Sequence, residues 1–302
     1  MKSPGQQITD ILMEHPERRN FEVTLERKAA GPILVAPASA TTVPVVVPGP
    51  ILPLRMRDLI PNGRTSGGAI LYVRETSFTS SPIAPIKPGD LKPQADLTYE
   101  VQLQPVITIP AYMKLPKQYW QDFAMFQSWM DSRLLYGLAQ TEEGQLLNGN
   151  GVAPNLQGFM LVALAAPPLT APPAGAGAVL AGVASGIAFL YGNGYMPTGI
   201  VLNPNDFGVM LLSLGTPEYV TTPVSLWGIP VVVSKAMPSG SYLVGQFNPF
   251  SQIFDREEVA VEVADNNEDD FIKNLVTVRA EERLALAIYQ PAAFAKGTFT
   301  LP

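Results

Sequence analysis

The residue types that most often carry enzymatic catalysis are scarce in this chain. Its 302 residues include no cysteine and a single histidine, His15. Thiol nucleophiles, disulfides and thiolate metal sites are therefore excluded, and a histidine-based triad or a multi-histidine metal site would depend on His15 alone. The sequence also lacks a glycine-rich loop that could cradle phosphates. These observations predict a protein that is not a conventional enzyme and that holds no cofactor.

The densest cluster of carboxylates lies in residues 265–270, where Asp265, Glu268, Asp269 and Asp270 occur together. Such a cluster can bind calcium, but the spacing of an EF-hand loop and its central glycine are absent. We therefore expect a solvated acidic turn at this position, and the sequence predicts no metal site.

The composition indicates a folded protein with many turns and extended segments. The hydrophobic fraction of 47% is ample for a core, in one large domain or two closely joined ones. The 30 prolines and 25 glycines favour turns, arms and strands over a helical bundle. The formal net charge is −6 and no run of five or more basic residues occurs, so tight nucleic-acid binding is not expected.

The longest stretch without charge raises the question of a membrane helix. No charged residue occurs between Glu143 and Asp206, and residues 177–191 are apolar and small. That segment is shorter than the ~20 residues that a membrane span needs, and prolines and glycines bound it. We expect a buried or interface helix there. Residues 1–20 are polar and charged, so they do not fit a signal peptide.

Residues 71–110 are the segment around which we expect the other elements to be organised. Residues 71–78 and 96–103 both alternate large apolar and polar side chains, which is the period of a half-exposed strand. The residues between them that forbid a regular ladder are Pro82, Pro85, Pro88, Gly89 and Pro93. A lone two-stranded ribbon is marginal in water, so we expect this one to lie on a neighbouring subunit.

The N-terminal segments differ in character from each other. Residues 1–28 are charged, and Ile8, Ile11 and Leu12 fit one face of a short helix. Residues 29–54 carry no charge and contain six prolines, which exclude a helix. Their valine and isoleucine content is too high for a free linker. We therefore favour an extended arm laid on another subunit over a disordered linker.

A long helix is predicted over residues 117–147, after Pro116. The apolar residues spaced by three and four positions along it are Phe123, Phe126, Met130, Leu134 and Leu138. Glycines at 149 and 151 end the pattern. A helix of this length would be ~45 Å long. Its aromatic residues (Tyr119, Trp120, Phe123, Phe126 and Trp129) are expected to be core rather than a cofactor site.

The remaining residues predict an α/β unit followed by long strands. Within residues 158–245 we expect the apolar helix, a strand at 199–202, a helix at 205–214, and strands at 229–234 and 242–246. The strands expected after this unit span residues 251–263, 271–280 and 284–289.

Six stretches of the sequence carry a family resemblance. They are residues 72–78, 91–97, 137–149 (GLAQTEEGQLLNG), 199–204 (GIVLNP), 227–230 (WGIP) and 271–287. Together they resemble the major capsid proteins of tailed phages of the Hong Kong 97 type, in the order and spacing of that family from about Arg57 to the C-terminus. The resemblance implies an α+β capsid fold. That fold has an N-terminal arm, an extended two-stranded loop (E-loop), a peripheral domain with a long spine helix, and an axial α/β domain.

The resemblance also implies boundaries for these parts. They are the N-terminal segment and arm (1–54), the lead-in (55–70), the E-loop (71–110), the peripheral domain with its spine helix (111–157), the axial domain (158–247), the peripheral-domain strands (248–288) and the C-terminal return to the axial domain (289–302). Members of the family usually carry charged residues on the first axial helix, whereas residues 178–190 have none here, which suggests tighter packing or a partner.

The function implied by the resemblance is structural. Copies would form the pentamers and hexamers of an icosahedral head that encloses double-stranded DNA, assembled in the host cytoplasm. The implied partners are other copies, a portal, a scaffold or maturation protease, decoration proteins, and DNA by weak non-specific contact, with no membrane. Residues 1–28 resemble the end of a cleaved scaffolding segment, and an ordinary mobile N-terminus is an equal alternative. The alternative function is the shell of an encapsulin-type compartment that holds protein cargo.

Some members of this family crosslink their subunits, and the resemblance implies a candidate residue set for that reaction. Lys92 matches the lysine that attacks an asparagine side chain, Asn274 matches that asparagine, and Glu281 matches the glutamate that takes the proton. The product would be an isopeptide bond and ammonia, in a single turnover. Lys87 is the reserve nucleophile.

The chemistry makes physical demands on these residues. The lysine must lose its proton, and burial among apolar groups such as Leu91, Leu275 and Val276 would lower its pKa. Asn274 and Glu281 are seven residues apart, so on one regular strand they would face opposite ways. Either a bend or a glutamate from another copy is needed. The structural alternative is that Lys92 is a turn lysine, Asn274 a strand-edge amide and Glu281 a surface partner of Arg283.

Overall fold

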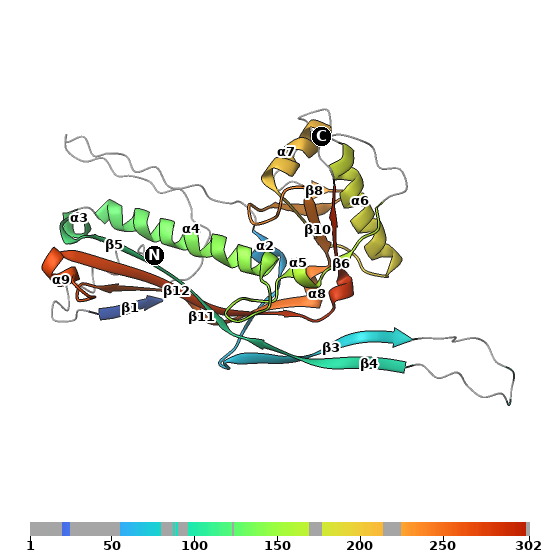
Figure 1. The fold of residues 1–302 in the computed structure, drawn as a ribbon, viewed down its shortest axis with the longest axis horizontal. Coiled ribbons are helices and arrows are strands. Elements are labelled where there is room, and N and C mark those ends of the chain that lie inside the picture. The colour runs from blue at the N-terminus through green and yellow to red at the C-terminus, as the bar shows by residue number, and fades with distance from the viewer. Residues whose placement is uncertain are drawn as a thin grey trace. The chain divides into compact units, whose positions relative to one another are not determined.

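The structure is a computed structural model, and Figure 1 labels its helices and strands. It describes residues 20–24, 55–79, 87, 89, 96–122, 124–168, 177–213 and 225–299. The expected N-terminal helix, the charge-free arm and Lys92 lie outside these residues. The chain divides into two compact units, of which unit 1 comprises residues 1–53, 107–143 and 255–284, and unit 2 comprises residues 54–106, 144–254 and 285–302.

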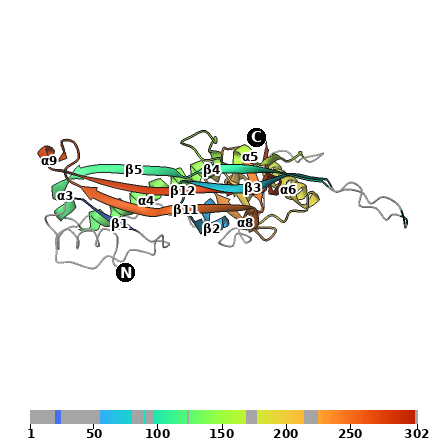
Figure 2. The same cartoon turned by 90° about the horizontal axis from the view of Figure 1, so that it is seen from below.

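Unit 1 is built on long strands that Figure 2 shows side by side. The strand order is β1 (Asn20–Thr24), β11 (Ser251–Ala264), β12 (Leu275–Ile288) and β5 (Ile107–Pro116), and β2 (Asn62–Arg64), whose residues belong to unit 2, also pairs with β11. The ladder between β12 and β5 is antiparallel and unbroken, from Leu275 opposite Pro116 to Leu284 opposite Ile107. The bounds of β11 confirm the strand predicted at residues 251–263.

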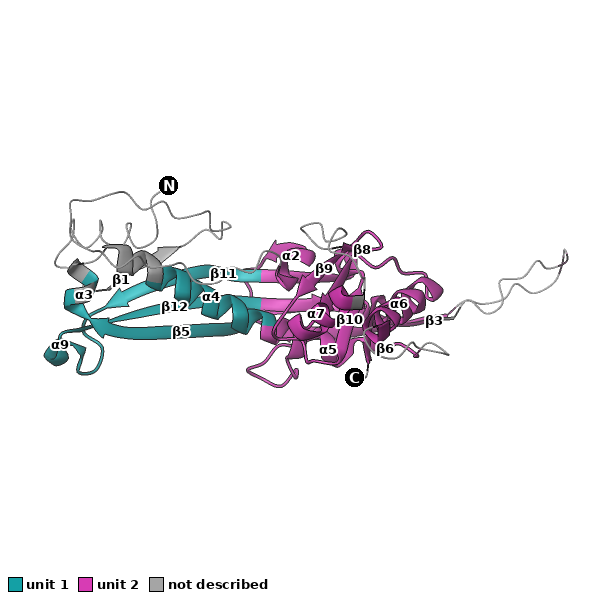
Figure 3. Cartoon of the chain, turned by 90° about the horizontal axis from the view of Figure 1, so that it is seen from above, with its two compact units in different colours: residues 1–53, 107–143, 255–284 teal, residues 54–106, 144–254, 285–302 magenta. Residues whose placement is uncertain are grey.

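The long helix covers one face of these strands. It begins as α3 (Lys117–Asp122) and continues as α4 (Ala124–Asn148), which confirms the helix predicted over residues 117–147. Figures 2 and 3 view unit 1 from opposite sides, with α4 behind the strands in the first and in front of them in the second. The side chains of β12 that are at most 2% exposed include Val276, Val278, Ala280 and Leu284. Even-numbered residues of β12 thus face the core under α4, and odd-numbered ones face away.

Unit 2 contains a six-stranded mixed sheet. Its order is β6 (Leu164–Ala165), β13 (Phe294–Thr298), β10 (Ser241–Gly245), β7 (Gly199–Leu202), β9 (Ile229–Val233) and β8 (Ser225–Leu226). Short helical turns accompany it: α2 (Met56–Leu59), α5 (Phe159–Val162), α8 (Phe247–Phe250) and the 3-10 turn η2 (Pro291–Ala293). Every residue of the central strand β7 is buried, since strands pair along both its edges and its Ile200 and Leu202 belong to the buried core of this unit. The predicted strands at 199–202, 229–234 and 242–246 are confirmed.

The charge-free segment of unit 2 forms a packed helix. The helix α6 (Gly177–Gly192) contacts β10, β13 and α7 (Pro204–Ser213), and its Val179, Val183 and Leu190 are fully buried. Burial of one face against the sheet explains why this helix tolerates no charge on that side. Within the described ranges, no helix combines the length and the hydropathy needed to cross a membrane.

The extended loop forms a ribbon of two antiparallel strands in unit 2, as predicted. The strand β3 (Ala69–Thr79) pairs with β4 (Asp96–Pro105), with a bulge between Glu75 and Ser77. At the base of the ribbon, Arg74 is buried and donates to the Ile288 carbonyl through Nε (3.2 Å) and Nη2 (3.1 Å). One face of the ribbon exposes apolar side chains, which are Leu71, Val73, Leu97, Tyr99, Val101 and Leu103.

One prediction about the last strands is wrong. Residues 271–280 and 284–289 were expected as two strands, but residues 275–288 form the single strand β12, and Asp270–Lys273 form a one-turn helix, α9. The reason is tertiary. The side chain of Asp270 is drawn into the sheet by Thr277 and Lys114, which turns the chain before β12 begins.

Candidate functional site

Asn274 occupies the junction between α9 and β12. Its backbone lies in the left-handed region (φ 55°, ψ 45°), which asparagine tolerates better than most residues. Its N–H donates to the carbonyls of Asp270 and Phe271, and its own carbonyl accepts from the Lys117 N–H at 2.9 Å. The side chain is exposed. Asn274 is therefore not a strand-edge amide but a helix cap whose side chain is open to a partner.

Glu281 lies within β12, opposite Pro110 of β5. It is an odd-numbered residue of this strand, so it projects from the face away from α4, together with Arg279 and Arg283. Its carboxylate forms an ion pair with Arg279 at 3.3 Å. The structural alternative placed Glu281 in a surface pair with Arg283, but Arg283 pairs with Glu257 of β11 at 3.0 Å.

The separation of Asn274 from Glu281 limits what one chain can do. Asn274 lies in the bend between α9 and β12, so it does not share one regular strand with Glu281. This is the bend that their spacing of seven residues called for. Leu275 and Glu281 are six residue steps apart on one unbroken strand, so at ~3.3 Å per step their Cα atoms lie ~20 Å apart. Neither side chain can bridge that distance. A proton acceptor beside Asn274 must therefore come from elsewhere than Glu281 of the same chain.

The acidic turn that precedes α9 is paired with lysines. Lys117 contacts Asp265 at 2.8 Å, and Lys114 contacts Glu268 at 2.8 Å and Asp270 at 3.2 Å. Lys273 pairs with Asp269, four residues before it. The turn is present as predicted, but its expected solvation is wrong for Asp270, whose side chain is fully buried. Among the described residues, no cluster of three or more metal-binding side chains occurs.

Electrostatics holds these carboxylates in the charged state. The Thr277 hydroxyl donates to Asp270, and with the Lys114 ammonium it lowers the pKa of that carboxyl against the opposing effect of burial. The side chain of Lys273 lowers the pKa of Asp269 in the same way. The two carboxylates Glu268 and Asp270 raise the pKa of Lys114. Lys114 therefore stays a cation and serves as a fixed charge rather than as a nucleophile.

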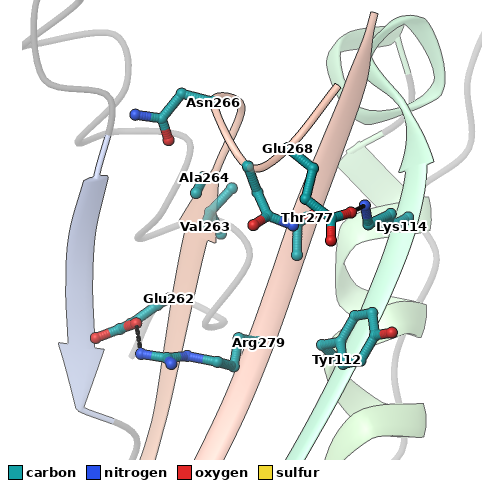
Figure 4. A pocket seen from close by; sticks show the side chains of 10 residues that line it. Tyr112, Lys114, Glu262, Val263, Ala264, Asn266, Glu268, Thr277 and Arg279 are labelled. Carbon is teal, nitrogen blue, oxygen red and sulfur yellow. Dashed lines mark hydrogen bonds and ion pairs between the residues drawn. The ribbon is translucent and has the colours of Figure 1, made fainter. Parts of the chain in front are cut away.

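A hollow of about 890 Å³ opens on the sheet beside this turn (Figure 4). Its walls include Tyr112 and Lys114 of β5, Glu262 of β11 and Arg279 of β12. Both cations point at carboxylates that line the same hollow, Lys114 at Glu268 and Arg279 at Glu262 (Figure 4). The charges of the walls are thus balanced within the chain, which gives the hollow no excess charge to attract an ion.

Exposed apolar side chains flank Asn274. Phe271 is 70% exposed and Ile272 is 86% exposed, on the one-turn helix that ends at Asn274. Leu275 is half-buried, as a pocket wall could be, whereas Val276 is buried in the core, so its expected place beside the amide is wrong. Lys87 is exposed, and Leu91 and Lys92 lie outside the described residues.

Sequence reasoning missed two features of this site, the network of Asp270, Thr277 and Lys114 and the exposed pair Phe271 and Ile272. Asp270 and Thr277 are seven residues apart and Lys114 belongs to another strand, so no local pattern linked them. Phe271 and Ile272 were assigned to a strand. Two apolar residues directly after an acidic turn were the local signal that could have indicated an apolar surface here.

The comparisons with known proteins agree with this fold. The sequence model of the Phage capsid family matches residues 42–299. The major capsid protein of Enterobacteria phage HK97 is 40% identical over 269 residues, which cover 85% of this chain and 69% of that protein.

Two solved structures support the same fold at lower identity. The capsid of a native GTA particle matches with a TM-score of 0.62 and 17% identity, and the match covers 88% of this chain and 96% of the other chain. A structure from Mycobacterium phage Bobi matches with a TM-score of 0.65 and 12% identity, and the match covers 87% of this chain and 95% of the other chain.

Proposed function

We propose that this chain, which belongs to the phage capsid family and is a major capsid protein of the virion shell, joins its copies by isopeptide bonds. Lys92 of one copy would be the nucleophile and Asn274 of a second copy the acceptor. The observation that carries the proposal is the exposed side chain of Asn274, on a backbone held by hydrogen bonds on both sides. Sequence similarity over most of the chain adds support.

The reaction is a transamidation that balances without an added reagent. The neutral Nζ of Lys92 attacks Cγ of Asn274, a C–N bond forms, and the C–Nδ2 bond breaks to release ammonia. A carboxylate accepts a proton from the attacking amine and returns it to the leaving nitrogen. Phe271 and Ile272 would desolvate the arriving amine, which lowers the pKa of a lysine. Each bond forms once, so the chain is a structural protein rather than a turnover enzyme.

The carboxylate in this scheme is Glu281 of a different copy from the one that supplies Asn274. The ~20 Å of β12 between these residues supports that arrangement, since the reacting groups must approach to ~3–3.5 Å. Three copies would then meet at each bond, one with Lys92, one with Asn274 and one with Glu281. Closed symmetric shells supply such three-body contacts repeatedly.

Finer features of the assembly are part of the same proposal. Copies would form pentamers and hexamers, with residues 158–247 as the axial domain and residues 111–157 and 248–288 as the peripheral domain. The exposed apolar face of the β3–β4 ribbon supports its packing on a neighbouring copy. A portal, a scaffold or maturation protease, and decoration proteins would act during assembly. The net charge of −6 supports weak, non-specific contact with packaged DNA.

Denaturing gel electrophoresis of boiled, purified particles tests the crosslink. Wild-type particles should give a ladder, and mass spectrometry should identify a Lys92–Asn274 peptide that is lighter by one ammonia. Lys92→Arg and Asn274→Asp should each form shells that run as monomer, while Lys87→Arg should retain the ladder. A ladder in Lys92→Arg that disappears in Lys87→Arg would move the nucleophile to Lys87, and monomer from mature wild-type particles would refute crosslinking.

A further inference from the structure

We propose that Asp270, Thr277 and Lys114 form a positioning set that holds Asn274 in its reactive orientation. The inference rests on the proposed crosslinking and adds residues that do not themselves touch the reacting atoms. Its basis is a side-chain network on the sheet directly beneath the one-turn helix that carries the acceptor.

The network joins three elements of unit 1. Thr277 of β12 and Lys114 of β5 lie directly opposite each other in the ladder, so both side chains project from the same face. The carboxylate of Asp270, at the start of α9, accepts from the Thr277 hydroxyl and forms an ion pair with Lys114 at 3.2 Å. Its side chain is fully buried. One carboxylate thus ties the loop to two strands.

The tie closes the short loop that contains Asn274. The chain leaves the sheet after Ala264 and returns to it at Leu275, and the Asp270–Thr277 hydrogen bond joins the start of α9 to β12 across Asn274. A second bond, from the Lys117 N–H to the Asn274 carbonyl at 2.9 Å, holds the loop from the side of α3. Asn274 is therefore positioned between two anchors.

The helical turn of this loop is held by few backbone bonds: the Lys273 N–H donates to the Asp269 carbonyl at 3.0 Å, and the Asn274 N–H donates to the carbonyls of Asp270 and Phe271. A helix of one turn is not stable by itself, because nucleation costs more than one turn of hydrogen bonds returns. The bond from the Asn274 N–H to the Phe271 carbonyl is long, at 3.4 Å. Phe271 is 70% exposed and Ile272 is 86% exposed. Loss of the Asp270 anchor should therefore release the turn, and with it the left-handed backbone of Asn274.

Positioning should appear in the rate of the bond-forming step. A misplacement of ~1 Å at a reacting centre can cost ~10²-fold in rate. The fold of the subunit depends on the much larger core under α4, so shells should still form without the anchor. Crosslinking rate and shell assembly are thus separable measurements.

The test compares Thr277→Val with Thr277→Ser in assembled particles. Valine keeps the shape of threonine but removes the hydroxyl, and serine keeps the hydroxyl. We expect both variants to assemble, with crosslinking slowed about 10-fold or more in Thr277→Val. Thr277→Ser should crosslink at close to the wild-type rate. Thr108→Val, an exposed substitution on β5 of the same sheet, is the matched control and should leave the rate unchanged.

Two rate outcomes would overturn the proposal. One is wild-type crosslinking by Thr277→Val, and the other is equal slowing in Thr277→Val and Thr277→Ser, since the hydroxyl would then be irrelevant. Backbone deuterium exchange of residues 271–275 in unassembled subunits is a second readout that needs neither shells nor crosslinks. We expect exchange to accelerate in Thr277→Val but not in Thr277→Ser, and equal exchange in all proteins would also overturn the proposal.

The two readouts, crosslinking in particles and deuterium exchange in subunits, test the proposed function and this inference separately. Absence of crosslinks in mature wild-type particles would refute the crosslinking itself. The exchange measurement would then still report whether Asp270 and Thr277 anchor the loop.

Discussion

Asn274 and Glu281 of one chain are held apart by β12, because the ladder with β5 is unbroken from Leu275 to Leu284 and Glu281 lies ~20 Å along the strand from Leu275, the residue after Asn274. In the proposed crosslinking, the amide and the carboxylate of one chain would therefore belong to different reaction centres. Each copy would offer its asparagine at one contact and its glutamate at another.

This separation predicts complementation between two inactive variants. Asn274→Asp lacks the acceptor and Glu281→Gln lacks the base, so shells of either variant alone should run as monomer on a denaturing gel. In shells assembled from an equal mixture, Glu281 of the first variant can serve Asn274 of the second. A partial ladder should appear, built on Asn274 of the Glu281→Gln copies. Mixed shells that stay monomeric would show that each copy uses its own glutamate.

The buried carboxylate of Asp270 predicts a dependence of stability on acid. Its folded-state pKa lies below the ordinary value of 3.8, first because of the Thr277 hydroxyl and then because of Lys114, while burial and Asp269 oppose the shift. A lowered pKa stabilises the fold above the unfolded-state value, and that contribution is lost as pH falls through the folded-state value. Thr277→Val should therefore be less stable than wild type at neutral pH.

The difference should shrink as pH falls below 3.8 and through the lower folded-state pKa of Asp270, because the carboxyl is then protonated in the folded wild type as well. Urea unfolding midpoints of unassembled subunits, from about pH 6 to about pH 3, measure this difference. Thr108→Val should have the same urea unfolding midpoint as the wild type at every pH in this range. A constant difference between wild type and Thr277→Val across this range would exclude Asp270 as its source.

A hydrogen-bonded tyrosine at the base of the β3–β4 ribbon predicts a stability difference between two tyrosine variants. The hydroxyl of Tyr72 accepts from the Ile288 N–H at 3.3 Å and from Arg74 Nη2 at 3.1 Å, in a buried setting. Tyr72→Phe should lower the free energy of unfolding by about 1–2 kcal/mol, since those donors lose an acceptor. Tyr99→Phe, at a side chain that is 68% exposed, should change it by less than ~0.5 kcal/mol. Equal effects in urea unfolding would contradict this role of Tyr72.

The apolar face of the ribbon predicts an assembly defect without a folding defect. Val101 is 60% exposed and lies opposite Val73 in the ladder. Val101→Asp should leave the circular dichroism of subunits unchanged, because the side chain has few contacts to lose within the chain. Shell yield should fall at least about tenfold, since a cost of ~1.4 kcal/mol at each contact between copies lowers the association constant tenfold. Gln102→Asp, on the other face, is the control, and a normal yield from Val101→Asp would remove the apolar face from assembly.

Much of the fold could be predicted from local pattern. The long helix of α3 and α4 follows from apolar spacings of three and four, and β7 follows from a short apolar run next to turn residues. The β3–β4 ribbon follows from alternation on both sides of a proline-rich tip. These elements were predictable because the residues that decide them are close neighbours in the chain.

The site required more than local pattern. The sequence determined which groups are available, an asparagine and a glutamate seven residues apart with no histidine or cysteine beside them. Only the tertiary structure decided that residues 270–273 turn into a helix, since Lys114 of a distant strand holds Asp270. It also decided that Arg283 pairs with Glu257 rather than Glu281, because the neighbouring strand β11 brings that carboxylate within reach. Local sequence sets the period of an element, whereas the choice of ionic and hydrogen-bonding partners depends on which strands the fold places side by side.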